Sequence, residues 1–323
     1  MNIRSKKAIL IVSSLLITSG LVVGCADKKN EQNTNTTNKE QSVQTTKEDY
    51  TYENNEYFTS VDWLNKNLKN KDILIIDARS EDDYNKGHIP GAINVAWQSF
   101  CKMEGKAGDK DWGTLLDKDQ LSKIYSDLGI DKNKKVIVYA QKNGWGEDGR
   151  LAWMFKETGV DVRMLNGGMD LWKSNGEEIS KEKVDPKKSE YVIKELKNDI
   201  NIDTKTLKEK MNDVKIIDTR EKDEYDGATK FGEARGGHIP KSINIPFNEV
   251  YNEDGTIKFK ADLEKLFKDA GINKDDEIVT YCTSGIRSGH MALILKSIGY
   301  DNVKNYDASY YEWAGYKTNP VEK

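Results

Sequence analysis

The chain has 323 residues, which is enough for two domains of ordinary size. Apolar residues make up 37% and charged residues 32%, a composition typical of compact α/β domains. The 50 basic and 54 acidic residues give a net charge of −4, which argues against nucleic acid as a partner because its binders carry a basic face. Three cysteines without a Cys-x-x-Cys pair exclude a disulfide scaffold and a zinc finger, and the composition excludes a multi-pass membrane protein.

The first 25 residues have the features of an export signal. Basic residues at positions 4, 6 and 7 precede an apolar run over residues 8–23, which is short for a membrane-spanning helix. The run ends in Leu-Val-Val-Gly-Cys at 21–25, which resembles the bacterial lipobox. This resemblance implies removal of residues 1–24, a lipid anchor on Cys25, and a location on the extracytoplasmic face of the cell membrane. The alternative is an ordinary secretory peptide with an incidental cysteine.

Residues 25–51 are expected to form a flexible tether. Asn, Thr, Gln, Lys and Glu dominate this segment. Such a composition buries too little apolar surface to offset the entropy lost on ordering. We therefore expect the segment to hold a folded body away from the membrane.

The rest of the chain contains one pattern twice, which indicates two related domains. An apolar run ends in Asp-x-Arg at Arg79 and again at Arg220, 141 residues later. Gly-His-Ile-Pro at 87–90 returns at 237–240, preceded in the second copy by nine additional residues. Three further segments match: 113–115 with 255–257, 136–139 with 278–281, and, less closely, 168–172 with 309–313.

The periodicity within each copy predicts an α/β fold. Short apolar runs at 73–76, 136–139 and 278–281 predict strands buried on both faces of a parallel sheet. Amphipathic stretches predict helices, at 118–128, 150–158, 261–270 and 288–298. We expect two tandem domains, each a parallel sheet flanked by helices, over residues 52–178 and 191–323, joined by a charged linker at 179–190.

The order of these motifs resembles the rhodanese family. Asp-x-Arg, Gly-His-Ile-Pro, a strand followed by a loop, and a C-terminal Trp occur in both copies, with a cysteine in that loop only in the second. Two such copies resemble the tandem sulfurtransferase branch of the family, over about residues 55–320. The resemblance implies two tandem rhodanese-like domains, a first domain that is catalytically silent, and an enzyme without a metal or organic cofactor. The implied reaction moves sulfur from thiosulfate, a small-molecule donor, to cyanide or a thiol through a Cys282 persulfide.

Cys282 is the candidate nucleophile because it directly follows a strand and precedes a helical stretch, where open α/β sheets place their sites. The loop around it should direct backbone N–H groups at the sulfur and so bind an anion, with Gly285 allowing the turn and Ser288 capping the next helix. This setting lowers the pKa of a thiol and favours the nucleophilic thiolate. The alternative is a buried core cysteine. The candidate substrate-binding residues of the loop are Thr283, Ser284, Gly285, Ile286, Arg287 and Ser288.

Charged residues around the loop have separate expected roles. Arg287 is expected to present a cation to the anionic end of the donor, unless it is a solvated residue at the start of the helix. Asp218 and Arg220 are expected to form a structural ion pair that supports the loop. The family resemblance leads us to expect a donor-binding Arg at position 224, where this chain has Glu224, and Arg235 is the candidate substitute.

The first copy lacks the nucleophile, because the match of Tyr139 with Tyr281 places Ala140 opposite Cys282. Residues 141–149 replace the tight loop, and we expect the helix to begin at Arg150. Other residues have structural interpretations. His88 and His238 occur in both copies and are expected to be structural, Cys101 is an incidental thiol, and Trp97, Trp112 and Trp145 belong to the core or line the interdomain cleft.

Three other functions stay open on the sequence alone. The donor could be 3-mercaptopyruvate, since Thr283 and Ser284 are small and uncharged. The protein could also be a non-catalytic carrier that delivers a persulfide to a partner. A Cys-dependent phosphatase is disfavoured, because Cys282 and Arg287 are separated by four residues and phosphatase loops have five.

Overall fold

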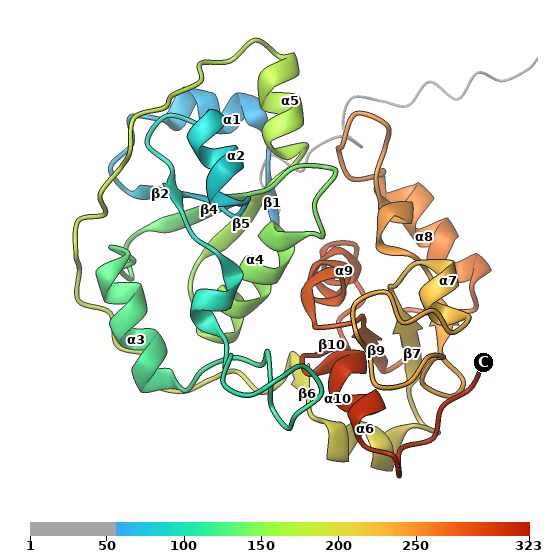
Figure 1. Ribbon diagram of the computed structural model, residues 1–323. Helices are drawn as coiled ribbons and strands as arrows, with labels where there is room; N and C mark the ends of the chain where they lie inside the picture. The colour runs from blue at the N-terminus through green and yellow to red at the C-terminus, as the bar shows by residue number, and fades with distance from the viewer. Residues whose placement is uncertain (1–55) are drawn as a thin grey trace, which may run out of the picture. The chain divides into compact units, whose positions relative to one another are not determined.

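The computed structural model describes residues 56–323 (Figure 1). The predicted signal peptide, the lipidation site Cys25 and the tether lie outside the described residues. Among the described helices, none is long and apolar enough to cross a membrane.

The first repeat forms a five-stranded sheet with helices on both faces. Its elements are β1 (Phe58–Thr59), α1 (Val61–Asn67), β2 (Ile73–Asp77), α2 (Glu81–Lys86), β3 (Ile93–Asn94), the 3-10 helix η3 (Trp97–Phe100), α3 (Lys118–Asp127), β4 (Lys135–Tyr139), α4 (Glu147–Glu157), β5 (Val162–Leu165) and α5 (Gly168–Ser174).

The second repeat has the same elements in the same order. They are β6 (Asn201–Ile202), α6 (Thr204–Lys210), β7 (Lys215–Asp218), α7 (Lys222–Tyr225), β8 (Ile243–Asn244), the 3-10 helix η4 (Phe247–Val250), α8 (Lys260–Asp269), β9 (Ile278–Tyr281), α9 (Ile286–Ser297), β10 (Val303–Tyr306) and α10 (Ser309–Gly315).

The two sheets share one topology. The strand orders are β1-β5-β4-β2-β3 and β6-β10-β9-β7-β8, and every pair is parallel. The register is also the same, because Asp77 pairs with Tyr139 just as Asp218 pairs with Tyr281. The predicted fold class, two parallel sheets flanked by helices in tandem, is therefore confirmed.

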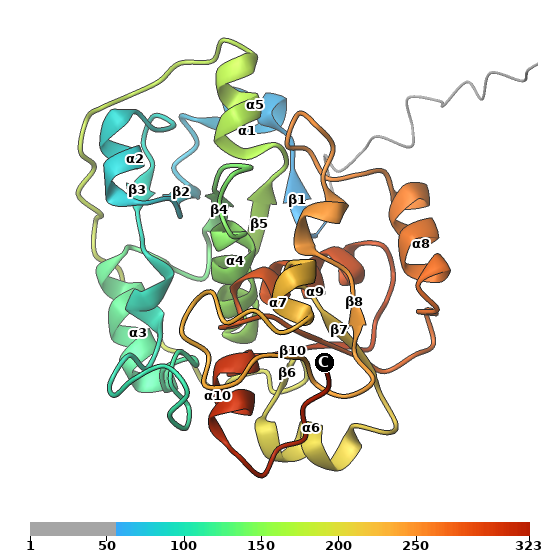
Figure 2. The same ribbon diagram turned by 45° about the vertical axis from the view of Figure 1, so that its right-hand side comes forward.

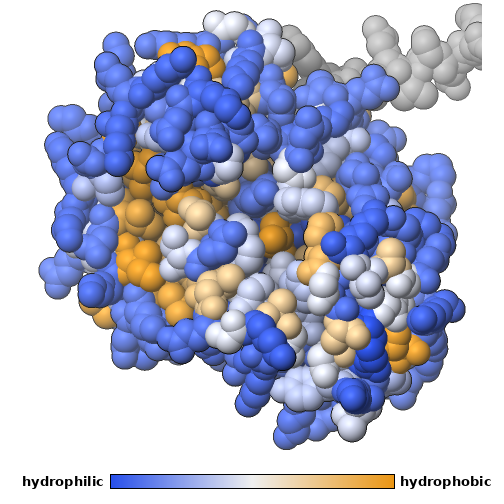
Figure 3. All heavy atoms as spheres, viewed as in Figure 1, coloured by the Kyte–Doolittle hydropathy of each residue, from blue (hydrophilic) through white to orange (hydrophobic). Residues whose placement is uncertain are grey.

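Each sheet buries its two faces in different cores. In the first domain, Ile137 and Trp172 belong to a core that packs α1 and α5 on one face. Val136 and Val138 point to the opposite face, whose core extends through α4 into α9 of the second domain. This alternation explains why β4 is apolar at consecutive positions. On the face shown in Figure 3, hydrophilic residues cover most of the surface, and apolar residues gather in the hollow across its middle.

Helices α4 and α9 pack directly against each other between the sheets, as both ribbon views show (Figure 2). A Cβ atom added at Gly149 would lie 2.3 Å from Cβ of His290, so this contact requires a glycine. The apposed helices join the two domains through a shared apolar core.

Two turns cross from one domain to the other in a symmetric way. The N–H of Leu115 donates to Asp307 Oδ2 at 2.9 Å, and the N–H of Ile257 donates to Asn166 Oδ1 at 2.8 Å. Asp307 and Asn166 each follow the strand β10 or β5 of their own domain. The repeated Gly-Thr-Leu and Gly-Thr-Ile motifs are therefore interdomain contacts.

The helices that follow β4 and β9 begin earlier than predicted. Helix α4 begins at Glu147 rather than Arg150, and α9 begins at Ile286 rather than Ser288. Each is preceded by a glycine in the left-handed conformation, Gly146 with φ 77° and Gly285 with φ 82°. A glycine can begin a helix without a capping side chain, so the start of α9 predicted from Ser288 as the cap is too late.

Candidate active site

Cys282 lies at the carboxyl end of β9, where a short loop leads directly into α9. Gly285 is required in this loop for two reasons. Its φ of 82° is in the left-handed region, and a Cβ atom would lie 2.6 Å from both the Asp307 carbonyl oxygen and Nη1 of Arg150. The glycine therefore permits a turn tight enough to fold the loop around its own cysteine.

Hydrogen-bond donors surround the sulfur of Cys282. The N–H of Gly285 lies 3.1 Å from Sγ and donates to it, and Oγ of Ser288 lies 3.6 Å from Sγ. Ser288 was predicted to cap the helix, but it lies in the first turn with its hydroxyl directed at the thiol.

These donors determine the ionisation of the thiol. Burial acts to raise the pKa of Cys282, but the charge of Arg287 and hydrogen bonds from Ser288 and Ser284 outweigh it and lower the pKa below its usual value. A thiol with a lowered pKa is present as the nucleophilic thiolate over a wider pH range. The loop is thus suited to a cysteine nucleophile and to a negatively charged product on it.

Arg287 makes its contacts within the protein. Its guanidinium forms two parallel hydrogen bonds to the carboxylate of Glu224, at 2.7 and 2.8 Å, and also donates to Thr283 Oγ1 at 2.8 Å. The side chains of Arg287 and Glu224 are 3% and 0% exposed. The pairing of these two residues, 63 positions apart, is a feature that we did not predict.

A pocket of about 130 Å³ opens onto the cysteine. Its base is formed by the loop and its walls by three aromatic residues from different segments. Trp145 comes from the first domain, Phe231 from the additional residues of the second copy, and Tyr311 from α10. The rings of Trp145 and Phe231 meet edge to face with centroids 5.3 Å apart. The other lining residues are Cys282, Thr283, Ser284, Ile286 and Arg287.

Helix α10 holds the loop from the other side. Ser309 has a φ of 54°, unusual for a residue other than glycine. Its Oγ accepts the N–H of Cys282 at 3.2 Å and donates to the carbonyl of Tyr306 at 2.8 Å. Sequence reasoning missed Ser309, although the repeat contained a signal. Its counterpart Gly168 has φ 51°, so both copies need an unusual backbone conformation there.

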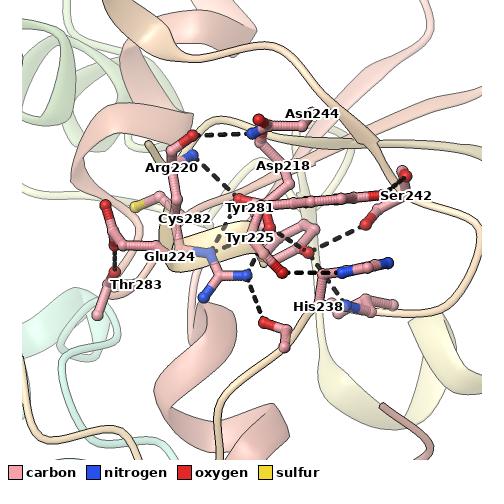
Figure 4. A network of polar contacts seen from close by, with 12 residues as sticks. Asp218, Arg220, Glu224, Tyr225, His238, Ser242, Asn244, Tyr281, Cys282 and Thr283 are labelled. Carbon is pink, nitrogen blue, oxygen red and sulfur yellow. Dashed lines mark hydrogen bonds and ion pairs between the residues drawn. The ribbon is translucent and has the colours of Figure 1, made fainter. Parts of the chain in front are cut away.

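Asp218 and Arg220 form a fully buried ion pair beside the loop (Figure 4). Asp218 also accepts a hydrogen bond from the hydroxyl of Tyr281 at 2.6 Å. In the same network the ring of His238 stacks on Tyr225 with centroids 3.6 Å apart. His88 stacks on its neighbouring Tyr84 in the same way in the first domain, at 3.8 Å. These groups connect the strand, the Gly-His-Ile-Pro turn and the loop, and none of them lines the pocket.

The structure does not bring Arg235 into the pocket. Its guanidinium donates to four backbone carbonyls of the C-terminal segment, those of Trp313, Ala314, Tyr316 and Asn319. Arg235 therefore anchors the end of the chain in this structure and does not face the sulfur.

The described part of the first domain, from residue 56, has no equivalent site. Ala140 follows β4, and the loop to Gly146 is three residues longer than its counterpart in the second domain. Two positions after the helix-starting glycine stands Asp148, where the second domain has Arg287. Burial raises the pKa of Asp148 to about 7. The extended loop instead places Trp145 over the guanidinium of Arg287, 5.0 Å from the ring centroid.

Arg150 connects the first domain to the back of the cysteine loop. It forms a buried ion pair with Asp307 and donates to the carbonyl of Gly285 at 3.2 Å. Its Nη2 also lies 3.7 Å from Sγ of Cys101, whose pKa is raised by burial to about 11. Cys101 is therefore a neutral thiol at physiological pH, and it does not line the pocket.

Of the three tryptophans predicted to belong to the core or line the cleft, Trp97 and Trp112 do not line the pocket. The ring of Trp112 packs edge to face on Tyr311 with centroids 5.5 Å apart. Trp97 lies against the guanidinium of Arg150, 5.7 Å from the ring centroid.

Comparisons with known proteins agree with this geometry. The Rhodanese-like domain family matches the chain twice, over residues 60–175 and 203–316. A sulfur carrier protein of Thermus thermophilus is 32% identical over 84% of this chain and 98% of its own length. A thiosulfate sulfurtransferase of Corynebacterium glutamicum is 29% identical over 84% of this chain and 92% of its own.

The fold also occurs in a solved structure of an ergothioneine biosynthesis enzyme from Chlorobium limicola, with a TM-score of 0.75 and 22% sequence identity over 83% of this chain and 70% of that one. That likeness concerns the fold alone. The family match and the similarity to the named relatives go further. This chain belongs to the rhodanese family, with two rhodanese-like domains in tandem, and is a sulfurtransferase.

Proposed function

We propose that the protein moves the outer sulfur of thiosulfate to a thiophilic acceptor through a persulfide on Cys282. The observation that carries this proposal is the thiol itself, buried at a strand end with the Gly285 N–H donating to its sulfur at 3.1 Å. The charge of Arg287 and the Ser288 hydroxyl add to the stabilisation of an anion at this position.

The first half-reaction loads the enzyme. The Cys282 thiolate attacks the outer sulfur of thiosulfate, the S–S bond of the donor breaks, and sulfite leaves with the bonding electron pair. The cysteine then carries one additional sulfur as a persulfide anion. Donors within the loop can stabilise this anion without rearrangement, which is the arrangement that favours a charged intermediate.

The second half-reaction unloads the enzyme. Cyanide or a thiolate attacks the outer sulfur of the persulfide, and the Cys282 thiolate leaves. Thiocyanate or a new persulfide is the product. A thiolate with a low pKa is a good leaving group, so the same loop contacts serve both steps.

A second candidate function is that of a sulfur carrier that passes its persulfide to a protein partner. The similarity to the Thermus thermophilus sulfur carrier protein favours it. The two functions differ in turnover. An enzyme consumes many equivalents of thiosulfate with cyanide as acceptor, whereas a carrier releases sulfur only to its partner.

The steady-state assay with thiosulfate and cyanide tests the proposal. Cys282→Ser should abolish turnover, because a hydroxyl replaces the thiolate, while Cys101→Ser should leave turnover nearly unchanged. Equal loss in both variants would contradict the assignment. The same assay with 3-mercaptopyruvate tests the donor, and a tenfold higher kcat/KM for that compound would overturn the assignment of thiosulfate.

We also propose that acyl chains on Cys25 attach the protein to the outer face of the cell membrane. The lipobox-like sequence before this residue supports the proposal. Cys25→Ala should release the protein from the membrane fraction or leave it unprocessed. Full retention of the variant in membranes would place the anchor elsewhere.

A further inference from the structure

A buried carboxylate, that of Glu224, lies beside the nucleophile and is fully engaged. Oε1 accepts hydrogen bonds from Thr283 Oγ1 and from Nη2 of Arg287, at 3.0 and 2.8 Å. Oε2 accepts hydrogen bonds from the N–H of Glu221 and from Nη1 of Arg287, at 3.1 and 2.7 Å. Burial alone would raise the pKa of Glu224, but its contacts with Arg287 lower it, so the group is an anion at neutral pH.

The geometry points to Glu224 as a specificity-determining residue that selects sulfur donors by charge and disfavours dianions. This inference rests on the proposed function and names the substrate class of the same site. Glu224 occupies the hydrogen-bonding face of Arg287 that a donor anion would otherwise use. We infer that donors with one negative charge and an apolar substituent are used at least as well as thiosulfate, which stays a substrate.

The guanidinium of Arg287 is already engaged by Glu224. A guanidinium binds an anion most strongly through two parallel N–H groups, and both Nη atoms of Arg287 already make that contact with Glu224. Nη2 makes a further bond to Thr283. A donor can gain the paired contact only if the Glu224 carboxylate withdraws from a site where it is 0% exposed.

The charge at the pocket also bears on the donor. The ionised side chains among the described residues that line the pocket are those of Cys282 and Arg287, and Glu224 pairs with Arg287. With the thiol ionised they sum to one negative charge. Thiosulfate adds two negative charges to this surrounding, and a monoanionic donor adds one. Burial strengthens the difference, since charges interact more strongly in a medium of low dielectric constant.

The walls of the pocket beside Arg287 are aromatic. The ring centroids of Trp145 and Phe231 lie 5.0 and 5.9 Å from the guanidinium carbon of Arg287. These side chains are 42% and 40% exposed, so part of their apolar surface is open to the pocket and the solvent. An apolar substituent on the donor would cover them, whereas the small sulfonate of thiosulfate would not.

The test compares thiosulfate with methanethiosulfonate, which has the same transferable sulfur, one negative charge and a methyl group. The reaction is balanced in the same way, since methanesulfinate leaves with the electron pair in place of sulfite. The measured quantity is the ratio of kcat/KM for thiosulfate to that for methanethiosulfonate, with cyanide as acceptor. A ratio is independent of the fraction of active protein, so partial misfolding of a variant does not alter it.

Glu224→Gln should raise this ratio about tenfold, the size expected when one charge-assisted contact becomes available to the donor. The matched control is Asp226→Asn, which removes the carboxylate directly after the same short helix, α7. This carboxylate is paired with Lys222, and the Asp226 side chain is 55% exposed. The control should leave the ratio unchanged. An unchanged or lower ratio in Glu224→Gln would overturn the inference.

A measurement on the unaltered protein covers the case in which Glu224→Gln does not fold. Unreactive anions that bind the pocket should protect Cys282 from iodoacetamide. Methanesulfonate should protect at lower concentration than sulfate, and the reverse order would overturn the inference. Failure of the proposed function would look different, since no donor would then load a persulfide on Cys282 while the order of protection could still be measured.

Discussion

The hydroxyl of Ser309 accepts a hydrogen bond from the backbone N–H of Cys282 at 3.2 Å, and so joins the start of α10 to the nucleophile. The next two residues extend the connection. The N–H groups of Tyr310 and Tyr311 donate to the carbonyls of Cys282 and Thr283, both at 3.0 Å. The position of the reacting sulfur is thus determined by a segment that follows it by 27 residues.

Ser309→Ala should therefore destabilise the protein and slow turnover. The buried N–H of Cys282 would lose its acceptor, at a cost of about 1–3 kcal/mol. Ser309→Gly also loses the acceptor, but it relieves the backbone strain at φ 54°, so it should be the less destabilised variant. Chemical denaturation of both variants measures this order, and an Ala variant as stable as the wild type would show that the bond contributes nothing.

The two described cysteines should differ in their dependence on pH. The pKa of Cys282 is lowered, whereas burial raises the pKa of Cys101 to about 11. Because the thiolate is the reactive form, alkylation of Cys282 should increase at a lower pH than that of Cys101, which should increase only as the pH approaches its pKa.

Rates of iodoacetamide labelling at each cysteine, followed by peptide mass spectrometry across a pH series, measure this difference. Cys101 reacting first at pH 7 would contradict the assignment of the nucleophile.

The buried pair of Arg287 and Glu224 should show strong coupling in stability. Removing either partner leaves the other as an uncompensated buried charge, so Arg287→Met and Glu224→Gln should each destabilise the protein by up to about 3–5 kcal/mol. The double variant should be more stable than the sum of the two single effects predicts. Urea unfolding of the four proteins gives the coupling energy, and simple additivity would mean that the contact has no energetic consequence.

A thiol in the first domain should not create a second active site. Ala140→Cys would place sulfur at the equivalent strand end, but the loop there is longer and Asp148 stands where the second domain has its cation. The persulfide content after incubation with thiosulfate should remain one sulfur per chain. Two sulfurs per chain would show that the strand end alone is sufficient.

The sequence predicted those features that depend on local pattern or on repetition. Apolar runs and matched motifs predicted two parallel sheets, and the strand of residues 278–281 has the predicted bounds. Helix starts were less accurate. Gly146 and Gly285 begin α4 and α9 without a side-chain cap, and Arg150, expected at the helix start, reaches into the interface instead.

Contacts between distant segments could not be predicted in this way. Glu224 and Arg287 are 63 positions apart, and this spacing does not indicate that the Glu224 carboxylate pairs with the guanidinium of Arg287. Arg235 was predicted to bind the sulfur donor because of its charge. In the structure its guanidinium donates hydrogen bonds to backbone carbonyls instead. The aromatic walls of the pocket likewise come from two loops in different domains and from α10.

Mass spectrometry of the folded protein after incubation with thiosulfate tests whether Cys282 carries the transferred sulfur. We expect the mass of one added sulfur atom on the peptide that contains Cys282, its loss on addition of cyanide, and no addition at Cys101. An added sulfur on Cys101, or an unmodified Cys282 in a protein that still produces thiocyanate, would contradict this assignment.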